Sequence, residues 1–207
     1  MSGPPPRLLV LTDRRLAASR GRSVVDVARA ALRAGAPAIV LREKDLPREQ
    51  RRHLAGQLTA EAAATRGRLI VASDAELAAE MGCEVVHLAV GDVVPDDGEL
   101  RWGRSCHSRP EVERAGAEGA GYVLVSPVFA TASKPGYGPP LGLDGLAHLV
   151  EAAGSLPVVA LGGMTPERVP SCLAAGASGV AVMGAVMAAE DPGAVVSRIL
   201  ATLPAGS

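Results

Sequence analysis

The chain has 207 residues, of which 48% are hydrophobic and only 2% are aromatic, and its formal net charge is −1. This length supports one domain with a substantial core of Val, Leu, Ile and Ala. The balanced charge argues against a nucleic-acid surface, and no apolar run approaches a membrane span. Cys83, Cys106 and Cys172 form no CxxC pair and no secretory segment opens the chain, so we expect a reduced, cytoplasmic protein.

Short apolar runs recur along the chain, and most precede a segment whose apolar residues have helical spacing. The runs predict strands at Leu8–Leu11, Ala38–Leu41, Leu69–Ala72, Val85–Val90, Trp102–Cys106, Tyr122–Val125, Val158–Leu161 and Gly179–Met183. The other segments predict helices at Val24–Ala34, Arg48–Arg66, Ala75–Met81, Pro110–Ala117, Leu143–Ala153, Pro166–Ala175 and Val186–Leu203. We expect Val93–Leu100, before the weak fifth run, to form a loop or one turn.

The alternation of strand and helix is typical of a parallel sheet. Eight such units in one domain predict an α/β fold, a closed single-domain (β/α)8 TIM barrel with short loops. The alternative is an open doubly wound sheet. Because no linker divides the chain, we expect one barrel domain over residues 7–203, with disordered tails at 1–6 and 204–207.

Polar and charged residues follow most of the predicted strands. In chain order they are Thr12-Asp13, Arg42-Glu43-Lys44, Ser73-Asp74, Asp92, Ser105-Cys106-His107, Ser126-Pro127, Gly162-Gly163 and Met183-Gly184. Active sites of this fold lie at the C-terminal ends of the strands. We therefore expect these residues to meet at one rim of the barrel.

The turns after the seventh and eighth strands predict a phosphate site. Gly162 and Gly163 form the first turn, ahead of a helix expected to start at Thr165-Pro166, and Met183-Gly184-Ala185 form the second. Barrels often bind phosphate with these two turns, through backbone N–H groups. A tight turn without a ligand is the alternative.

Two cations follow the second strand. Arg42 and Lys44 point the same way along an extended chain and can together hold a diphosphate. In the alternative interpretation they are solvated surface charges, paired with Glu43 or Asp45.

Two carboxylates follow the third and fourth strands. Asp74 and Asp92 on neighbouring strand ends can share one Mg²⁺, which takes further oxygens from water and phosphate. The alternative role of Asp74 is to cap the helix that begins at Ala75.

The segment Ala130–Pro140 is long for this chain and rich in Gly and Pro. Its Thr131, Ser133 and Lys134 suit phosphate oxygens, so we predict a lid over the substrate, with a plain surface loop as the alternative.

One histidine at the rim is a candidate acid or base. His107 follows Ser105 and Cys106 and can act in this way, although a lone histidine is more often structural. Cys106 has no activating partner other than His107, and we expect no thiol nucleophile. His87, within a strand, is expected to be packed.

These motifs together resemble the superfamily of thiamine phosphate synthases and TenI-like thiazole tautomerases. The resemblance spans roughly residues 8–200. The matching pieces are LTD at 11–13, LREK at 41–44, ASD at 72–74, HLAVGD at 87–92, GRSCHS at 103–108, YVLVSPVFATASK at 122–134, VALGGMTPER at 159–168 and GASGVAVMGA at 176–185.

The resemblance implies roles for the matching positions. It implies that the diphosphate is bound by Arg42, Lys44 and Lys134, and that Mg²⁺ is held by Asp74 and Asp92. It also implies substrate contacts by Ser105 near a pyrimidine, by Thr131 and Ser133 in the phosphate-binding loop, and by Gly162, Gly163 and Gly184 at a thiazole phosphate.

Three positions depart from the pattern. Synthases typically carry glutamine at the position of Val40 and asparagine at that of Ser73, and both contact the pyrimidine diphosphate. The tautomerase branch has its catalytic histidine where this chain has Pro127, and it tends to lose the two metal aspartates that this chain keeps.

The resemblance therefore implies one of three functions. The first is a thiamine phosphate synthase, a transferase that couples hydroxymethylpyrimidine diphosphate to thiazole phosphate and releases diphosphate. The second is a thiazole tautomerase that needs no metal and uses His107 or Cys106. The third is a non-catalytic paralogue that binds thiazole phosphate or thiamine phosphate. In each case we expect small phosphorylated ligands, no nucleic acid and no membrane, with homo-oligomerisation left open.

Overall fold

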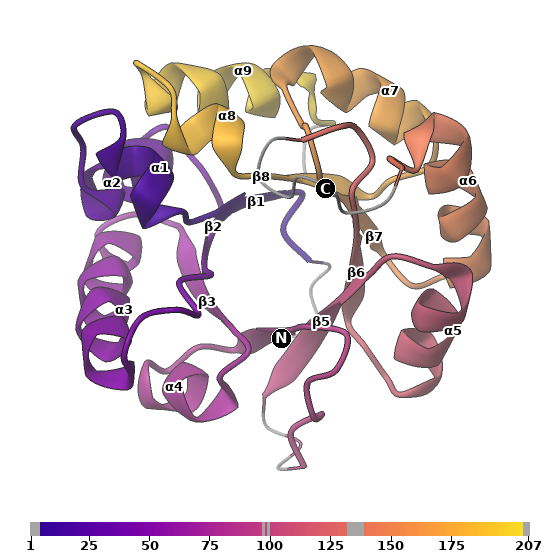
Figure 1. Cartoon of the computed structure of the whole chain (residues 1–207), viewed down its shortest axis with the longest axis horizontal. Helices are drawn as coiled ribbons and strands as arrows, with labels where there is room; N and C mark the ends of the chain where they lie inside the picture. The colour runs from indigo at the N-terminus through magenta and orange to yellow at the C-terminus, as the bar shows by residue number, and fades with distance from the viewer. Residues whose placement is uncertain (1–4, 97, 99, 132–138, 205–207) are drawn as a thin grey trace.

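The barrel is closed by strands that all run parallel (Figure 1). The computed structural model describes residues 5–96, 98, 100–131 and 139–204. In these residues each strand pairs with the next in the chain and the last pairs with the first. The strands are β1 Leu8–Leu11, β2 Ala38–Leu41, β3 Arg68–Ala72, β4 Val85–Leu88, β5 Arg101–Cys106, β6 Tyr122–Val125, β7 Val158–Ala160 and β8 Gly179–Val182. The predicted TIM barrel is confirmed and the open doubly wound sheet is wrong.

The helices form a ring around this barrel (Figure 1). They are α1 Arg14–Ala18, α2 Val24–Arg33, α3 Arg48–Ala63, α4 Ala75–Glu80, α5 Arg109–Ala117, α6 Gly142–Ala153, the 3₁₀ turn η1 Pro166–Arg168, α7 Val169–Ala174, α8 Gly184–Met187 and α9 Pro192–Thr202. Within the described residues, no helix is long and apolar enough to cross a membrane.

Alternating side chains along each strand build two apolar layers. Leu9 and Leu11 of β1 point into the barrel, where they pack with Val40. Leu8 and Val10 point outward into the layer beneath the helices. Burial on both faces explains why the strands read as continuous apolar runs.

Helix α1 was not predicted from the sequence. It spans little more than one turn, which is too short for a periodic pattern. The side chain of Asp13 caps it by accepting a hydrogen bond from Leu16 N at 2.9 Å, and Glu43 accepts one from Arg14 N at 2.8 Å.

The single helices predicted at Pro166–Ala175 and Val186–Leu203 are each divided in two. Pro170 lies in the first turn of α7, and Pro192 begins α9. A proline has no N–H to continue a preceding helix, but it suits a first turn. Asp191 caps α9 by accepting a hydrogen bond from Ala194 N at 2.9 Å.

The chain ends are described only in part. Residues 1–4 and 205–207 lie outside the description, so the disordered tails stay a prediction. Arg7, just before β1, donates a hydrogen bond to the carbonyl of Pro204 at 3.1 Å.

Candidate active site

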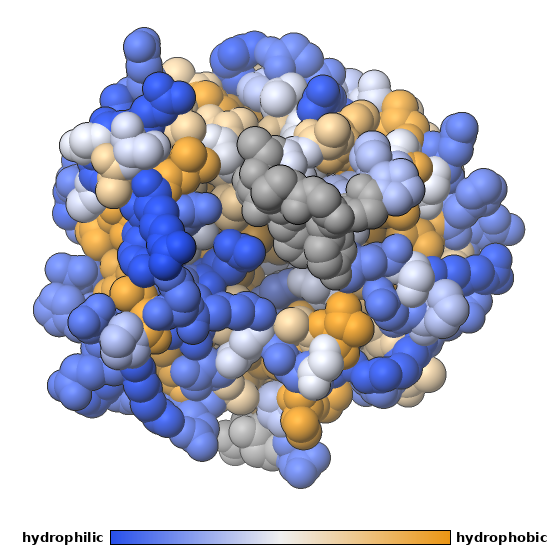
Figure 2. Space-filling view, viewed as in Figure 1, coloured by the Kyte–Doolittle hydropathy of each residue, from blue (hydrophilic) through white to orange (hydrophobic). Residues whose placement is uncertain are grey.

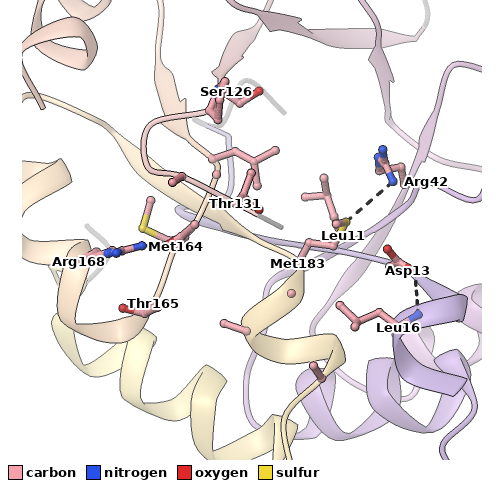
Figure 3. Close-up of a pocket in the computed structure, with 18 of the residues that line it drawn as sticks. Leu11, Asp13, Leu16, Arg42, Ser126, Thr131, Met164, Thr165, Arg168 and Met183 are labelled. Carbon is pink, nitrogen blue, oxygen red and sulfur yellow. Dashed lines mark hydrogen bonds between the residues drawn. The ribbon is translucent and has the colours of Figure 1, made fainter. Parts of the chain in front are cut away.

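A cavity of about 760 Å³ opens at the C-terminal ends of β1, β2, β6, β7 and β8. Arg42 and Arg168 lie on opposite sides of it, with Met183 and Thr131 between them (Figure 3). Hydrophilic side chains gather beside the barrel opening near α1 and α3 (Figure 2). The volume suits a small organic ligand, and the cavity lies on the rim where the sequence predicted an active site.

Arg42 is fixed by the neighbouring strand. Its backbone N–H donates to Oγ1 of the fully buried Thr12 at 3.0 Å, just beyond the paired ends of β1 and β2. Its Nη1 atom lies 4.0 Å from the sulfur of Met183. The guanidinium is therefore directed across the cavity toward the turn after β8.

The carboxylates beside Arg42 and Lys44 are paired with another arginine. Arg14 contacts the buried Glu43 at 2.8 Å and both oxygens of Asp45 at 2.7 and 2.9 Å. These hydrogen bonds lower the pKa of Asp45 to about 2. Among the described residues, neither Arg42 nor Lys44 forms an ion pair. The pairing with Glu43 or Asp45 that the alternative interpretation offered is wrong, because arginines of α1 occupy both carboxylates, and both cations are available to a ligand.

Lys44 interacts electrostatically with charged residues at the C-terminal rim of the barrel. Partial desolvation lowers its pKa, the charge of Asp92 opposes this, and Arg42 and Arg51 lower the pKa further by repulsion. Lys44 thus lies within electrostatic range of both Arg42 and Asp92.

The two predicted phosphate turns present unused donors to the same cavity. Gly162, Gly163, Gly184 and Ala185 all line it. In the described part of the chain, none of their backbone N–H groups has an acceptor. Converging N–H groups of this kind favour an anion.

The structure shows why the first turn requires glycine. Both residues have positive φ angles, +105° at Gly162 and +59° at Gly163. A Cβ atom on Gly162 would lie 2.7 Å from Pro127 Cα, and one on Gly163 would lie 2.5 Å from the carbonyl oxygen of Ala130. The protein's own loop after β6, rather than a ligand, occupies the space that the glycines leave.

Asp74 has the capping role that was its alternative interpretation. Its Oδ1 accepts a hydrogen bond from Leu77 N at 2.9 Å at the start of α4. Its Oδ2 lies 3.2 Å from Nη1 of Arg51, a buried residue of α3 that also donates to the carbonyl of Ala72. The carboxylate is thereby held in place at the end of β3.

Asp92 is held by two hydrogen-bond donors. Burial alone would raise its pKa, but hydrogen bonds from the Ser73 hydroxyl and from Ala89 N at 2.6 Å, together with the charges of Lys44 and Arg104, lower it. Ser73 has a φ of +56°, a conformation that asparagine adopts more readily than serine. The carboxylate is therefore ionised and oriented at neutral pH.

The donor set suits Mg²⁺ only with help from a ligand. Within the described residues, no three or more His, Cys, Asp or Glu side chains gather into a potential metal site. Mg²⁺ is commonly held by one or two carboxylates plus waters and substrate phosphates. Asp74 and Asp92 fit that pattern.

The predicted acid–base candidates lie outside the cavity lining. Nδ1 of His107 lies within hydrogen-bonding distance of the Ser126 carbonyl, and its backbone N–H donates to Glu111. Cys106 is fully buried and lies in the outer core layer, and burial raises its pKa to about 12. Neither residue lines the cavity.

The predicted lid lies only partly within the described residues. Thr131 lines the cavity, whereas Ser133 and Lys134 lie outside the described residues. The lid and the roles of these residues stay predictions.

Sequence reasoning missed Arg168, Arg51 and Tyr122. Arg168 lines the cavity, donates to the carbonyl of Gly163 and lies 4.5 Å above the ring of Phe129. Its place after the Gly-Gly turn was a usable signal. The sequence around Arg51 contains no such signal, because its partner Asp74 is 23 residues away in the chain.

Comparisons with known proteins show which family the chain resembles. A family model described as thiamine monophosphate synthase matches residues 8–186. A putative thiamine-phosphate synthase from Geobacter sulfurreducens is 37% identical over 204 residues, covering 95% of this chain and 94% of the relative. A thiamine-phosphate synthase from Roseiflexus castenholzii is 39% identical, covering 92% and 85%. The solved structure of a thiamine phosphate pyrophosphorylase from Pyrococcus furiosus superimposes with a TM-score of 0.83 at 30% identity, covering 95% and 94%.

Proposed function

Because the chain belongs to the thiamine monophosphate synthase family, we propose that it is a thiamine-phosphate synthase. The reaction couples hydroxymethylpyrimidine diphosphate to thiazole phosphate and releases diphosphate. The supporting observation is that one rim presents two kinds of anion site within the described residues: Arg42, which forms no ion pair and has Lys44 within electrostatic range, and the N–H groups of the glycine turns, which have no acceptor. Such a rim fits two substrates, one with a diphosphate and one with a phosphate.

The two cations promote loss of the diphosphate. The bond between the pyrimidine methylene carbon and the diphosphate oxygen breaks, and the thiazole nitrogen forms the new bond to that carbon. Negative charge grows on the departing diphosphate, where Arg42 and Lys44 stabilise it. The thiazole phosphate, held at the turns of Gly162 and Gly184, positions the attacking nitrogen. No nucleophilic side chain is required.

Mg²⁺ belongs to the proposal as a cofactor. Asp74 and Asp92 would hold it together with oxygens of the substrate, and it would supply further positive charge at the diphosphate. Arg51 and Ser73 keep the two carboxylates oriented for this purpose.

The geometry favours the transferase over the tautomerase. Pro127 has no titratable group, Cys106 is buried away from the cavity, and Nδ1 of His107 contacts a backbone carbonyl. None of the titratable candidates that the sequence offered as a base therefore lines the cavity. Val40 is buried inside the barrel and offers only apolar surface to a pyrimidine.

We propose a cytoplasmic location for this reaction, which the free thiols of Cys83, Cys106 and Cys172 support. Homo-oligomerisation stays a prediction.

The test is turnover of both substrates by the purified protein, with Mg²⁺ or with a chelator. We expect equal amounts of diphosphate and thiamine phosphate, and loss of both with the chelator. Arg42→Gln should lower kcat/KM by about 10²-fold, as for loss of one charge-stabilising donor. The matched control is Arg109→Gln, because the ion pair of this exposed arginine of α5 within the described residues is with Glu113, on the same helix.

Three other outcomes would overturn the proposal in distinguishable ways. Conversion of a thiazole tautomer without Mg²⁺ indicates the isomerase. Tight binding of thiamine phosphate without turnover of either substrate set indicates the binding paralogue. Normal turnover by Arg42→Gln removes the role given to the cations.

A further inference from the structure

Three polar side chains form a hydrogen-bonded chain inside the barrel. Tyr122 Oη of β6 lies 3.0 Å from His87 Nδ1 of β4, and His87 Nε2 lies 2.8 Å from Ser105 Oγ of β5. Tyr122 and His87 are buried, whereas Ser105 is partly exposed. The hydrogen-bonded chain of side chains thus runs from the buried interior of the barrel to Ser105, near the C-terminal end of β5.

A glycine makes this contact possible. In the strand register His87 and Tyr122 both lie beside Gly103, one on each side of β5. The two rings stack across it, with centroids 5.7 Å apart. A Cβ atom at Gly103 would lie 2.1 Å from Tyr122 Cε1, so any side chain there would separate the rings.

The direction of the protons follows from what each atom can donate. Desolvation and the charge of Lys44 lower the pKa of His87 to about 4, so its ring is neutral and carries one N–H. Within the described residues, Tyr122 Oη has no hydrogen-bond partner other than His87. Its proton must go to Nδ1, since a buried donor without an acceptor is costly. The ring proton therefore sits on Nε2 and points at Ser105 Oγ.

Ser105 is left with a defined orientation. Its oxygen accepts the hydrogen bond from His87, so its own proton points away from the ring and is left to a ligand at this partly exposed position. A hydroxyl fixed in this way donates a hydrogen bond and favours an acceptor over a donor on the ligand.

We infer that His87 and Tyr122 are positioning residues that fix the Ser105 hydroxyl as a hydrogen-bond donor to a ring nitrogen of the pyrimidine substrate. The identity of the substrate rests on the proposed function, but the proton arrangement does not. The negatively charged end of that substrate is already matched by Arg42 and Lys44.

The proton arrangement is tested by NMR on the whole protein labelled with ¹⁵N-histidine. We expect the His87 resonances of a neutral ring with a protonated Nε2 and a bare Nδ1 between pH 6 and 8, about the range over which a typical histidine titrates. Tyr122→Phe should shift the Nδ1 resonance or mix the two tautomers. A protonated Nδ1 or a charged ring in the native protein would contradict the inference, whatever the protein catalyses.

The effect on the substrate is tested by a double-mutant cycle. Tyr122→Phe should raise KM for the pyrimidine diphosphate about fivefold, as for one lost hydrogen bond. The same change in a Ser105→Ala background should have no further effect, because the donor is already absent. KM for thiazole phosphate should not change.

Two controls separate positioning from stability. Ile70→Val, inside the barrel on β3, removes core volume but leaves all three hydrogen-bonding side chains in place, and should leave the ratio of the two KM values unchanged. His87→Gln, whose amide can donate toward Ser105, should retain more activity than His87→Leu.

Each outcome of the cycle bears on one claim. If Tyr122→Phe costs the same in both backgrounds, the positioning role is wrong while the synthase function stands. If the native protein makes no thiamine phosphate, the proposed function fails and the NMR result alone decides the orientation of Ser105.

Discussion

At the scale of single residues, the arginines of the rim differ mainly in what already contacts them. Arg14 is occupied by Glu43 and Asp45, and Arg51 by Asp74, whereas Arg42 forms no ion pair within the described residues. The spacing of Arg42 and Lys44 predicted a cationic pair directed to one side. It could not reveal that Arg14, 29 residues before Glu43, keeps that pair unneutralised.

Arg14→Ala should destabilise the fold because it leaves the buried Glu43 carboxylate without a charged partner. We expect the free energy of unfolding to fall by about 1–3 kcal/mol, as measured by urea denaturation. Arg15→Ala is the matched control, since the side chain of Arg15 is 77% exposed and, among the described residues, forms its ion pair with Asp45 alone. Its effect should stay within about 0.5 kcal/mol. Equal effects of both substitutions would contradict a structural role for Glu43.

The buried His87 should make stability depend on pH. Its pKa in the folded protein, about 4, lies below the ordinary value of 6.5. The unfolded chain therefore takes up a proton first as the pH falls. The stability due to a neutral His87 is complete above pH 6.5 and is lost between about pH 6.5 and pH 4, for a total of about 3 kcal/mol.

The measurement is urea denaturation of native protein and His87→Gln at several pH values across this range. The native protein should lose more stability on acidification than the variant. Carboxylates titrate in both, so only the difference between the two curves reports on His87. Parallel curves would show that His87 is not held neutral.

At the scale of elements, apolar periodicity located the barrel strands to within two residues at each end, because both faces of each strand are buried. Helix boundaries were less predictable. The breaks before α7 and α9 depend on single prolines, and α1 depends on Glu43 from another unit of the barrel. Local sequence patterns do not contain such distant partners.

The turn after β7 gives a prediction at this scale. Gly162→Ala should destabilise the protein more than Gly119→Ala, which follows α5. Both glycines have positive φ, but a Cβ atom on Gly119 meets open space and one on Gly162 meets the backbone of Pro127. We expect an extra loss of about 1–3 kcal/mol in urea denaturation from this overpacking.

The same pair of variants tests the phosphate site. Only Gly162→Ala should raise KM for thiazole phosphate, because only that change displaces the turn whose N–H groups line the cavity. If the two alanine variants have equal stability and equal KM, the close approach of the turn to Pro127 does not matter in solution.

At the scale of the whole molecule, closure of the barrel brings together groups that are far apart in the chain. Arg42 follows β2, the phosphate turns follow β7 and β8, and the hydrogen-bonded chain crosses β4, β5 and β6. The sequence predicted the barrel and this rim, since polar residues follow nearly every strand. It did not predict the interior contact of His87 with Tyr122, which depends on a strand register that only the closed sheet defines.

The most direct test of the central claim is a stoichiometric assay with both substrates and Mg²⁺. Native protein should form thiamine phosphate and diphosphate in equal amounts, and Arg42→Gln should form both about 10²-fold more slowly at limiting substrate. Arg109→Gln should match the native rate. Absence of thiamine phosphate from the native reaction, in protein shown to be folded, would contradict the claim.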